Sequence, residues 1–285
     1  MARDIVDFTK PSCIALTLLL AGFGVLSMRQ ASAQTQTVAT VAVATNQAKV
    51  KESAPVEQTA EAADEVKEKA EDDDKVVKLL GKEGLDTFYT WIAGAGVFVD
   101  PKGVFSIEEG VLRVSGERLG YLATRKEYSD FRLVAEYKWG ELKSGNRTEK
   151  PRSSGLFVHG VGEDKEWMRG FECQIAEGRT GNVVIHSGAK FTIGTNTHTR
   201  AWTEIGKPVQ ELEAKHGEWN KIEILSAGDK LRVLINGQQS VEATQLLPNR
   251  GKILLQSNGA EIFFRKLELH PLAKMPEAAV QTAAK

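Results

Sequence analysis

The sequence is poor in cysteine: Cys13 and Cys173 are the only two among 285 residues. Cys13 lies in an N-terminal segment that we expect to be removed, so Cys173 would have no partner for an intramolecular disulfide. An exported domain without disulfides must be stabilised by its hydrophobic core, and a chain of this length can bury enough apolar surface to do so. We therefore expect a domain that depends on its core.

The chain also has no large excess of charge of either sign. It contains 37 Lys and Arg against 38 Asp and Glu, a formal net charge of −1, and no long basic run. A protein that binds the phosphate backbone of nucleic acid carries a basic surface. We therefore expect no nucleic-acid partner.

Motifs for cofactors and metals are absent as well. The chain has no Gly-rich phosphate loop and no Gly-x-Ser-x-Gly elbow. Apart from His159, its histidines are scattered without metal-ligand spacing, at positions His186, His198, His216 and His270. We expect neither a cofactor nor a metal ion.

The N-terminal 33 residues have the three parts of a secretory signal peptide. A weakly basic start precedes an uncharged apolar run over residues 13–26, and Ala31-Ser32-Ala33 has the small-x-small form of a cleavage site. The run is shorter than the roughly 20 apolar residues of a transmembrane helix. We predict cleavage after Ala33, a periplasmic or secreted protein, and no membrane association afterwards. An uncleaved N-terminal anchor is the alternative.

Residues 34–75 are predicted to be a disordered linker, and residues 273–285 a frayed tail. The linker is rich in Thr, Ala, Gln, Lys and Glu, contains no aromatic residue, and ends near the acidic cluster 71–74. Such a segment cannot offset its ordering entropy by burial. A metal-binding role for the acidic cluster is the alternative, but no second group of ligands accompanies it.

Residues 76–272 show short alternating runs separated by turn residues. Over residues 131–139, apolar and polar side chains alternate, and Asn236-Gly237 is a strong hairpin signal because both residues tolerate positive φ. Asn258-Gly259 joins two further runs. Many short strands without a long helical period predict an all-β domain, a two-sheet antiparallel sandwich.

The segment 171–177 is the first candidate for chemistry. On a strand, Glu172 and Gln174 share one face, while Cys173 lies on the apolar face and is expected to be buried and inert. Glu177 has the wrong parity, and a β-bulge would bring it to the face of Glu172. Two such carboxylates would suit acid–base cleavage of a glycosidic bond. The alternative is an ordinary solvated strand.

The segment 152–159 is the second candidate. It leads from a polar loop through Arg152 into a strand on which His159 shares a face with Phe157. Histidine exchanges protons near neutral pH, although a lone strand histidine is often a hydrogen-bonded structural group. Trp139 and Trp167 are near these segments and could stack on sugar rings, with core packing as the alternative.

These segments together resemble the family named the 3-keto-disaccharide hydrolase domain, which has a concanavalin A-like jelly roll related to glycoside hydrolase family 16. The resemblance covers nearly all of residues 79–272. It rests on the order and spacing of many short matches, among them Leu79-Leu80-Gly81, Asp100-Pro101, residues 136–140, Ser154-Gly155-Leu156, His159, Trp167-Met168, residues 172–178, Trp219-Asn220, Asn236-Gly237 and residues 251–257.

The resemblance implies cleavage of glycosidic bonds in sugars oxidised at C3, in a groove on the concave sheet. For such an enzyme, our candidates for catalysis are Glu172, Glu177 and His159, and our candidates for substrate binding are Glu136, Gln174, Trp139, Arg152 and Gln256. Gln174 stands where family 16 hydrolases have Asp, which disfavours double displacement. Ser153 and Asn258 stand where close relatives have Asp and Glu.

Three functions remain open: an enzyme on keto-sugar glycosides, a lectin-like module that binds carbohydrate without catalysis, and an interaction domain. The enzyme hypothesis makes a geometric prediction. Phe131, Leu133, Ala135 and Tyr137 should point into the core, and the side chains of Glu172, Gln174 and His159 should share one open face with Glu136.

Overall fold

The computed structural model describes residues 75–81, 84–206 and 212–277. The predicted signal peptide and residues 34–74 of the predicted linker lie outside the described residues, as do residues 278–285 of the predicted tail. No helix in the described part is long and apolar enough to cross a membrane.

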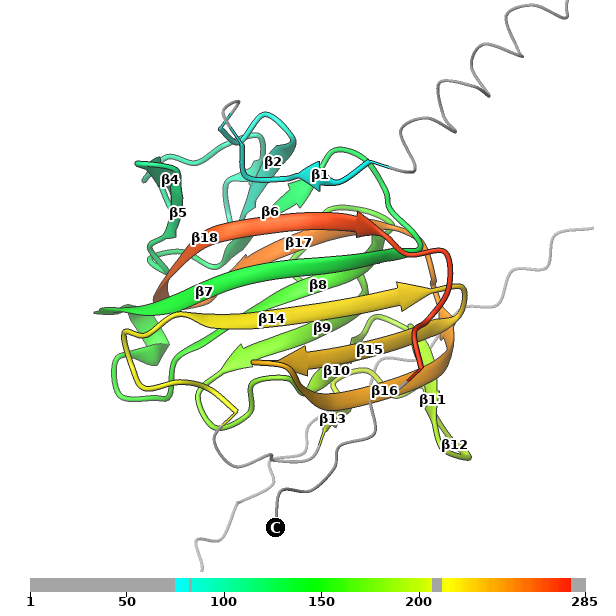
Figure 1. Cartoon of the computed structure of the whole chain (residues 1–285). Coiled ribbons are helices and arrows are strands. Elements are labelled where there is room, and N and C mark those ends of the chain that lie inside the picture. Colours follow the sequence, from blue (N-terminus) through cyan, green and yellow to red (C-terminus); the bar gives the residue numbers. More distant parts are fainter. Residues whose placement is uncertain (1–74, 82–83, 207–211, 278–285) are drawn as a thin grey trace, which may run out of the picture. The chain divides into compact units, whose positions relative to one another are not determined.

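Two antiparallel sheets make up the fold (Figure 1). The ten-stranded sheet has the order β12 (Asn196–His198), β11 (Lys190–Ile193), β16 (Gln238–Leu247), β15 (Lys230–Ile235), β14 (Asn220–Ala227), β7 (Phe131–Lys143), β18 (Ala260–Pro271), β5 (Val111–Val114) and β4 (Phe105–Glu108), with β1 (Val77–Lys78) paired to β18. The eight-stranded sheet has the order β13 (Glu204–Ile205), β10 (Val183–His186), β9 (Arg169–Ala176), β8 (Ser153–Val161), β17 (Lys252–Ser257), β6 (Gly120–Thr124), β2 (Phe88–Ile92) and β3 (Gly96–Val97).

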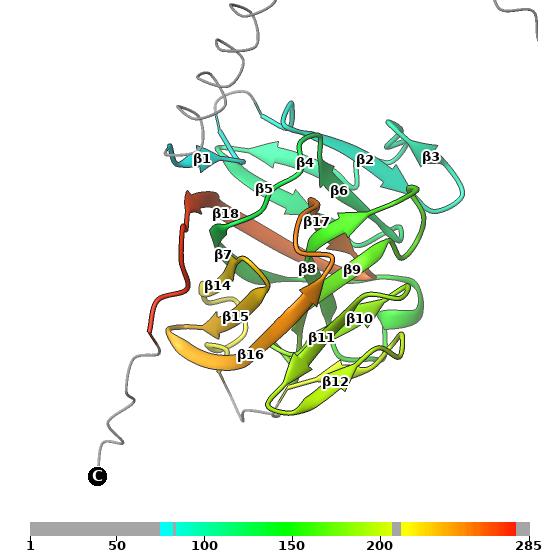
Figure 2. The same ribbon diagram turned by 90° about the vertical axis from the view of Figure 1, so that its right-hand side faces the viewer.

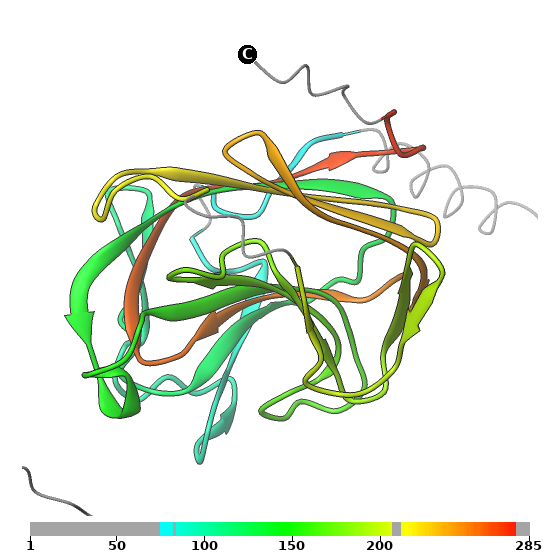
Figure 3. The ribbon, with the colours of Figure 1, turned by 90° about the horizontal axis from the view of Figure 1, so that it is seen from below.

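A single 3-10 turn, η1 (Gly145–Arg147), accompanies these strands in the part of the chain that the structure describes. The predicted all-β, two-sheet antiparallel sandwich is therefore confirmed. Figure 2 shows β2 and β3 at one side of the eight-stranded sheet and β10 toward the other. Seen from below, the two layers are stacked, and both ends of the eight-stranded sheet bend away from the ten-stranded one (Figure 3). Its outer face is therefore concave.

The core lies between the sheets and follows the alternation of the strands. On β7, the side chains of Phe131, Leu133, Ala135 and Tyr137 are all buried in it, as predicted, while Glu136 lies on the outer face of the ten-stranded sheet. Side chains two apart on a strand point to the same face, so one alternating run is enough to bury half of a strand.

Turn residues join the strands at two informative places. Asn236 (φ 48°) and Gly237 (φ 83°) connect β15 to β16, which confirms the predicted hairpin. The turn with Gly259 (φ 75°) connects β17 of the eight-stranded sheet to β18 of the ten-stranded sheet. The chain crosses between the layers at this turn.

Candidate functional site

The outer face of the eight-stranded sheet carries the predicted residues Glu172 and Gln174. Both project from β9 on the side opposite to Phe171, Cys173 and Ile175, which are fully buried in the core. The predicted division of this strand into a polar and an apolar face is confirmed. Burial raises the pKa of the Cys173 thiol, which is consistent with an inert core cysteine.

Gly155 gives the Glu172 carboxylate its place on this face. It pairs with Gln174 across β8 and β9, and a Cβ on it would lie 2.7 Å from Oε1 of Glu172. Gln256 lies on the neighbouring strand β17, one residue beyond Leu255, which pairs with Leu156 of β8. Glu172, Gln174 and Gln256 therefore surround a position that has no side chain.

His186 is the hydrogen-bond partner of Glu172. It ends β10, the strand next to β9, and its Nε2 lies 2.8 Å from Oε2 of Glu172. The two residues are 1% and 3% exposed, respectively. A carboxylate bound to an imidazole can accept a proton and is held in one orientation, which are the properties of a positioned general base. The sequence reasoning missed this pairing.

Aromatic rings surround His186 on the side away from Gln174. Phe157 and Trp167 stack on the imidazole, with centroid distances of 4.8 and 5.0 Å. The ring of Trp202 stands nearly perpendicular to that of His186 at 4.7 Å. The two sides of Glu172 thus differ in chemistry, since amides lie on one side and aromatic rings on the other.

Several buried polar atoms on the amide side have no hydrogen-bond partner within the described protein. They are Nε of Arg147 and both side-chain amide atoms of Gln256, which is 3% exposed. The stem of Arg147 packs against the turn after β17, since a Cβ on Gly259 would lie 2.5 Å from its Cγ. Burial and the neighbouring Arg179 lower the pKa of Arg147, while Glu172 opposes this effect. Buried polar groups normally have partners, and these atoms have none among the described residues.

A second polar cluster lies on the same face, toward β2 and β6. Oδ1 of Asp164 accepts hydrogen bonds from the hydroxyls of Tyr89 (2.6 Å) and Tyr121 (3.0 Å). Lys252 donates to the Tyr89 hydroxyl at 2.7 Å. Burial, and then Asp164, raises the pKa of Tyr89. These groups satisfy one another and form a rigid wall beside Phe157.

The prediction for His159 was wrong. Its ring is buried between the sheets, where Nε2 lies 2.8 Å from Oγ of Ser226 in β14. The cause is a β-bulge: Phe157 pairs with Leu254 and Gly160 with Lys252, so β8 has one residue more than β17 in this interval. One extra residue reverses the face of every later residue on the strand. Burial lowers the pKa of His159 to about 4.

The β-bulge that would bring Glu177 to the face of Glu172 does not occur. The β8–β9 register is unbroken from Ser153 paired with Ala176 to Val158 paired with Phe171, so Glu177 keeps the opposite parity to Glu172. Its carboxylate accepts hydrogen bonds from the backbone N–H of Arg152 (2.7 Å) and from the guanidinium (2.9 Å).

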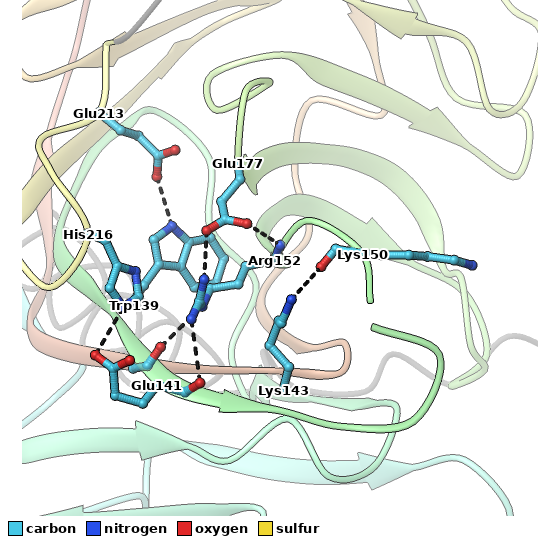
Figure 4. Close-up of polar contacts among 9 residues, drawn as sticks. Trp139, Glu141, Lys143, Lys150, Arg152, Glu177, Glu213 and His216 are labelled. Atoms are coloured by element: carbon cyan, nitrogen blue, oxygen red, sulfur yellow. Dashed lines mark hydrogen bonds and ion pairs between the residues drawn. The ribbon is translucent and has the colours of Figure 1, made fainter. Parts of the chain in front are cut away.

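Figure 4 shows Arg152 between Glu177 and the backbone of β7, where it donates to the carbonyls of Gly140 and Glu141. Burial raises the pKa of Glu177, and the bonds from Arg152 lower it by more, so that the net shift is downward. Arg152 and Glu177 therefore tie the two sheets together. They are not in contact with the Glu172 carboxylate.

Two predicted substrate-binding residues lie elsewhere. Glu136 forms an ion pair with Arg265 at 2.5 Å on the outer face of the ten-stranded sheet, so the prediction that it shares a face with Glu172 was wrong. Trp139 is a core residue, not an open platform, and its Nε1 donates to Glu213 at 3.1 Å (Figure 4). Of the predicted set, the structure brings together Glu172, Gln174 and Gln256.

Within residues 75–81, 84–206 and 212–277, no group of three or more His, Cys, Asp or Glu side chains is arranged to hold a metal ion.

The architecture is that of an all-β, two-sheet sandwich with a polar and aromatic outer face on the smaller sheet. The chain belongs to the family described as the 3-keto-alpha-glucoside-1,2-lyase-like domain, whose model matches residues 75–270. This confirms the resemblance seen in the sequence. No curated protein matches the chain in sequence.

Solved structures with similarity to the chain include two bacterial carbohydrate-related proteins. A candidate glycosyl hydrolase from Parabacteroides distasonis is 21% identical with a TM-score of 0.48, and the match covers 70% of this chain and 100% of that one. A carbohydrate-binding module from Bacillus subtilis is 12% identical with a TM-score of 0.40, and the match covers 57% of this chain and 89% of that one.

Proposed function

We propose that this domain cleaves the glycosidic bond of 3-keto-glycosides by elimination, with Glu172 as the base. The observation that carries the proposal is the Glu172–His186 pair, which presents a carboxylate on the outer face among unpartnered polar atoms. The family description, which names a 1,2-lyase of 3-keto-α-glucosides, supports the same chemistry.

The ketone at C3 acidifies the proton on C2, so a single well-placed carboxylate can remove it. Glu172 takes this proton, and the electron pair becomes an enolate. The C1–O bond then breaks as a C1=C2 double bond forms. The proton that Glu172 took from C2 passes to the leaving oxygen, so that the aglycone departs as an alcohol and Glu172 is again a carboxylate. Water adds across the double bond, with hydroxyl at C1 and a proton at C2, and the net reaction is hydrolysis.

The neighbouring residues have separate tasks in this scheme. His186 holds the Glu172 carboxylate through Oε2, and Oε1 lies over Gly155. Gln174 and Gln256 supply amide groups for the sugar hydroxyls and the C3 oxygen. Arg147 is a cation near Glu172 that favours the negative charge of the enolate, because an electrostatic attraction connects it to this site.

A carbohydrate-binding function without catalysis is the second candidate. It is favoured by the fate of Glu177, because the second carboxylate expected for displacement chemistry is bound to Arg152. A binding module would use the same amides and aromatic rings but would release no product. We retain elimination because it requires only one carboxylate, whereas a displacement requires a pair roughly 5–9.5 Å apart.

The test compares wild type with Glu172→Gln on 4-nitrophenyl 3-keto-α-glucoside. We expect the variant to lose release of 4-nitrophenol while its affinity for methyl α-glucoside, measured by calorimetry, is retained. Glu223→Gln is the matched control, since Glu223 is equally buried on the outer face of the other sheet and should turn over substrate normally. Wild-type protein that binds the glucoside but releases nothing would establish the binding function instead.

Glu177→Gln separates the two chemistries. Elimination by Glu172 predicts that this variant is less stable but still active, because it loses only the Arg152 contacts. If Glu177→Gln is as inactive as Glu172→Gln, a two-carboxylate mechanism replaces the elimination.

For the location of the protein, we propose export. N-terminal sequencing of the exported material should give a sequence that begins at Gln34.

A further inference from the structure

A recess of about 310 Å³ adjoins the Glu172–His186 pair on the side away from the amides. Trp167, His186, Ser187 and Trp202 are among the residues that line it. The function proposed above leaves this recess unused, because the sugar hydroxyls are assigned to Gln174 and Gln256.

The rings in this recess form two walls that meet at a right angle. Trp167 and His186 are parallel to within 8°. The ring of Trp202 stands at 78° to Trp167 and at 83° to His186. Trp202 is 60% exposed, so most of its indole surface remains open to a ligand. Aromatic faces exposed beside a catalytic carboxylate are suited to a flat apolar group.

The backbone holds this arrangement in place at a conformational cost. Trp202 (φ 65°) and Ser187 (φ 50°) both adopt the left-handed region, which a bulky residue rarely enters. The N–H of Trp202 donates to the carbonyl of Ile185 at 2.8 Å, and Oγ of Ser187 donates to the carbonyl of Trp167 at 2.9 Å. The backbone on either side of the recess is therefore held by hydrogen bonds.

Strain alone does not mark a site, as Phe98 demonstrates. Phe98 has φ 61° and is 66% exposed, yet Arg125 lies over its ring and it lines no recess next to Glu172. Trp202 combines strain and exposure with contact to the histidine that binds Glu172.

The position of the recess decides its occupant. Along β9, Gln174 lies on one side of Glu172, while His186 pairs with Gly170 on the other side. If the keto-sugar occupies the amide side, its glycosidic bond lies over Glu172 and the aglycone extends toward Trp202. We propose that this recess is the leaving-group subsite and that it selects glycosides with a planar, apolar aglycone. This proposal rests on the proposed function for the orientation of the sugar.

Binding of two glucosides that lack the 3-keto group tests the subsite without turnover. Phenyl α-glucoside and methyl α-glucoside share the sugar and differ only in the aglycone. Stacking of one ring on an aromatic side chain contributes roughly a tenfold gain in affinity. By calorimetry, wild type should bind the phenyl glucoside about tenfold more tightly than the methyl glucoside.

Trp202→Ala should reduce this preference to less than about twofold, and Trp202→Phe, which keeps an aromatic face, should preserve most of it. Phe98→Ala is the matched control and should leave the preference as in wild type. A wild type without preference, a preference retained in Trp202→Ala, or no binding of either glucoside would overturn the subsite. If wild type does not turn over 3-keto-glycosides but Trp202→Ala still loses the preference for the phenyl glucoside, the proposed elimination is rejected and the proposed subsite is supported.

Discussion

The outer faces of the two sheets differ in how completely their buried polar side chains are paired. On the ten-stranded sheet, charged groups pair with one another, and the pairs are Arg113–Glu261, Arg132–Glu223, Lys221–Glu223, Arg232–Glu242, Arg265–Glu136 and Lys266–Glu268. On the side of the eight-stranded sheet, Arg147 of η1 and Gln256 of β17 keep buried polar atoms that have no partner among the described residues. The proposed function places the sugar on the face whose buried polar atoms lack partners.

The aromatic residues of the two faces follow the same division. Trp219 on the ten-stranded side is covered by two cations, with Lys138 at 5.1 Å and Arg265 at 4.5 Å from the ring centroid. Trp202 beside the eight-stranded sheet is 60% exposed, and its ring contacts those of Trp167 and His186. The comparison therefore places the exposed aromatic surface beside the smaller sheet, where the proposed function needs it.

We expect the largest difference between the two faces from replacing one glycine on each of them. In Gly155→Ala, the new Cβ would lie 2.7 Å from Oε1 of Glu172 and would displace the carboxylate. Because a shift of about 1 Å at a reacting group can cost a hundredfold in rate, we expect turnover of 4-nitrophenyl 3-keto-α-glucoside to fall roughly a hundredfold.

Gly140→Ala is the counterpart on the other sheet, where the Cβ would lie 2.5 Å from Cγ of Glu261 and disturb its pair with Arg113. A partly exposed pair contributes less than about 1 kcal/mol, so turnover should be unchanged. Equal loss of activity in both variants would mean that alanine harms the sandwich as a whole.

The pH dependence of stability tests the core between the two sheets, where His159 is buried. The pKa of His159 falls from 6.5 to about 4 on burial, so the unfolded chain binds a proton here more readily than the folded one. The contribution of neutral His159 to the free energy of unfolding is therefore fully present above pH 6.5. It decreases as the pH falls, by roughly 2–3 kcal/mol at pH 4.5. Denaturant unfolding at several pH values measures this, and His159→Gln should remove most of the loss.

Below pH 4.5, protonation of carboxylates becomes the cause of the loss of stability. The folded-state pKa values of Glu177 and Glu223 are lowered by their hydrogen bonds and ion pairs, which outweigh the opposing effect of burial. Their contribution is present above pH 4.5 and is lost as the pH falls through the lowered values, in wild type and His159→Gln alike. An acid loss between pH 6.5 and 4.5 that survives in His159→Gln would point to another group.

Replacing a polar side chain should have opposite effects on the two faces. Gln256→Leu removes two unpartnered buried atoms, so we expect a gain of about 1 kcal/mol in unfolding free energy. Glu223→Leu leaves Arg132 and Lys221 without their partner and should cost about 1 kcal/mol. Gln256→Leu should also weaken binding of methyl α-glucoside, as measured by calorimetry. A loss of stability in Gln256→Leu would show that its amide is satisfied in solution.

Salt should have the smallest effect and should act on one face. The ion pairs of the ten-stranded sheet are partly exposed, so raising NaCl from about 0.05 to about 1 M should lower stability by less than about 1 kcal/mol. Affinity for methyl α-glucoside should stay constant, because hydrogen bonds and stacking carry it. Affinity that falls steeply with salt would mean that charges, not amides, hold the sugar.

Much of the fold could be predicted because it is local in the sequence. The alternation on β7 and the Asn236-Gly237 turn each depend on a few adjacent residues, and both predictions are confirmed. The prediction that Glu172 and Gln174 share a face was correct for the same reason, because side chains two residues apart stay on one face along an unbroken strand.

The errors in the site came from features that adjacent residues do not encode. The extra residue in β8 turned His159 inward, and the absence of one in β9 left Glu177 on the wrong face. His186 was missed because its contact with Glu172 depends on the pairing of two strands; the short apolar run that it ends was the available signal. Composition could not tell that Trp202 is exposed while Trp139 is buried.

Because Cys173 is buried, the reactivity of its thiol is a probe of the local opening of β9. It is the only cysteine in the described part of the chain, and its thiol is fully buried in the core, on the face of β9 opposite to Glu172 and Gln174. An alkylating reagent can reach it only when the strand separates from its neighbours, so the labelling rate reports that event. A ligand on the outer face binds only the closed strand and must slow the labelling in proportion to its occupancy.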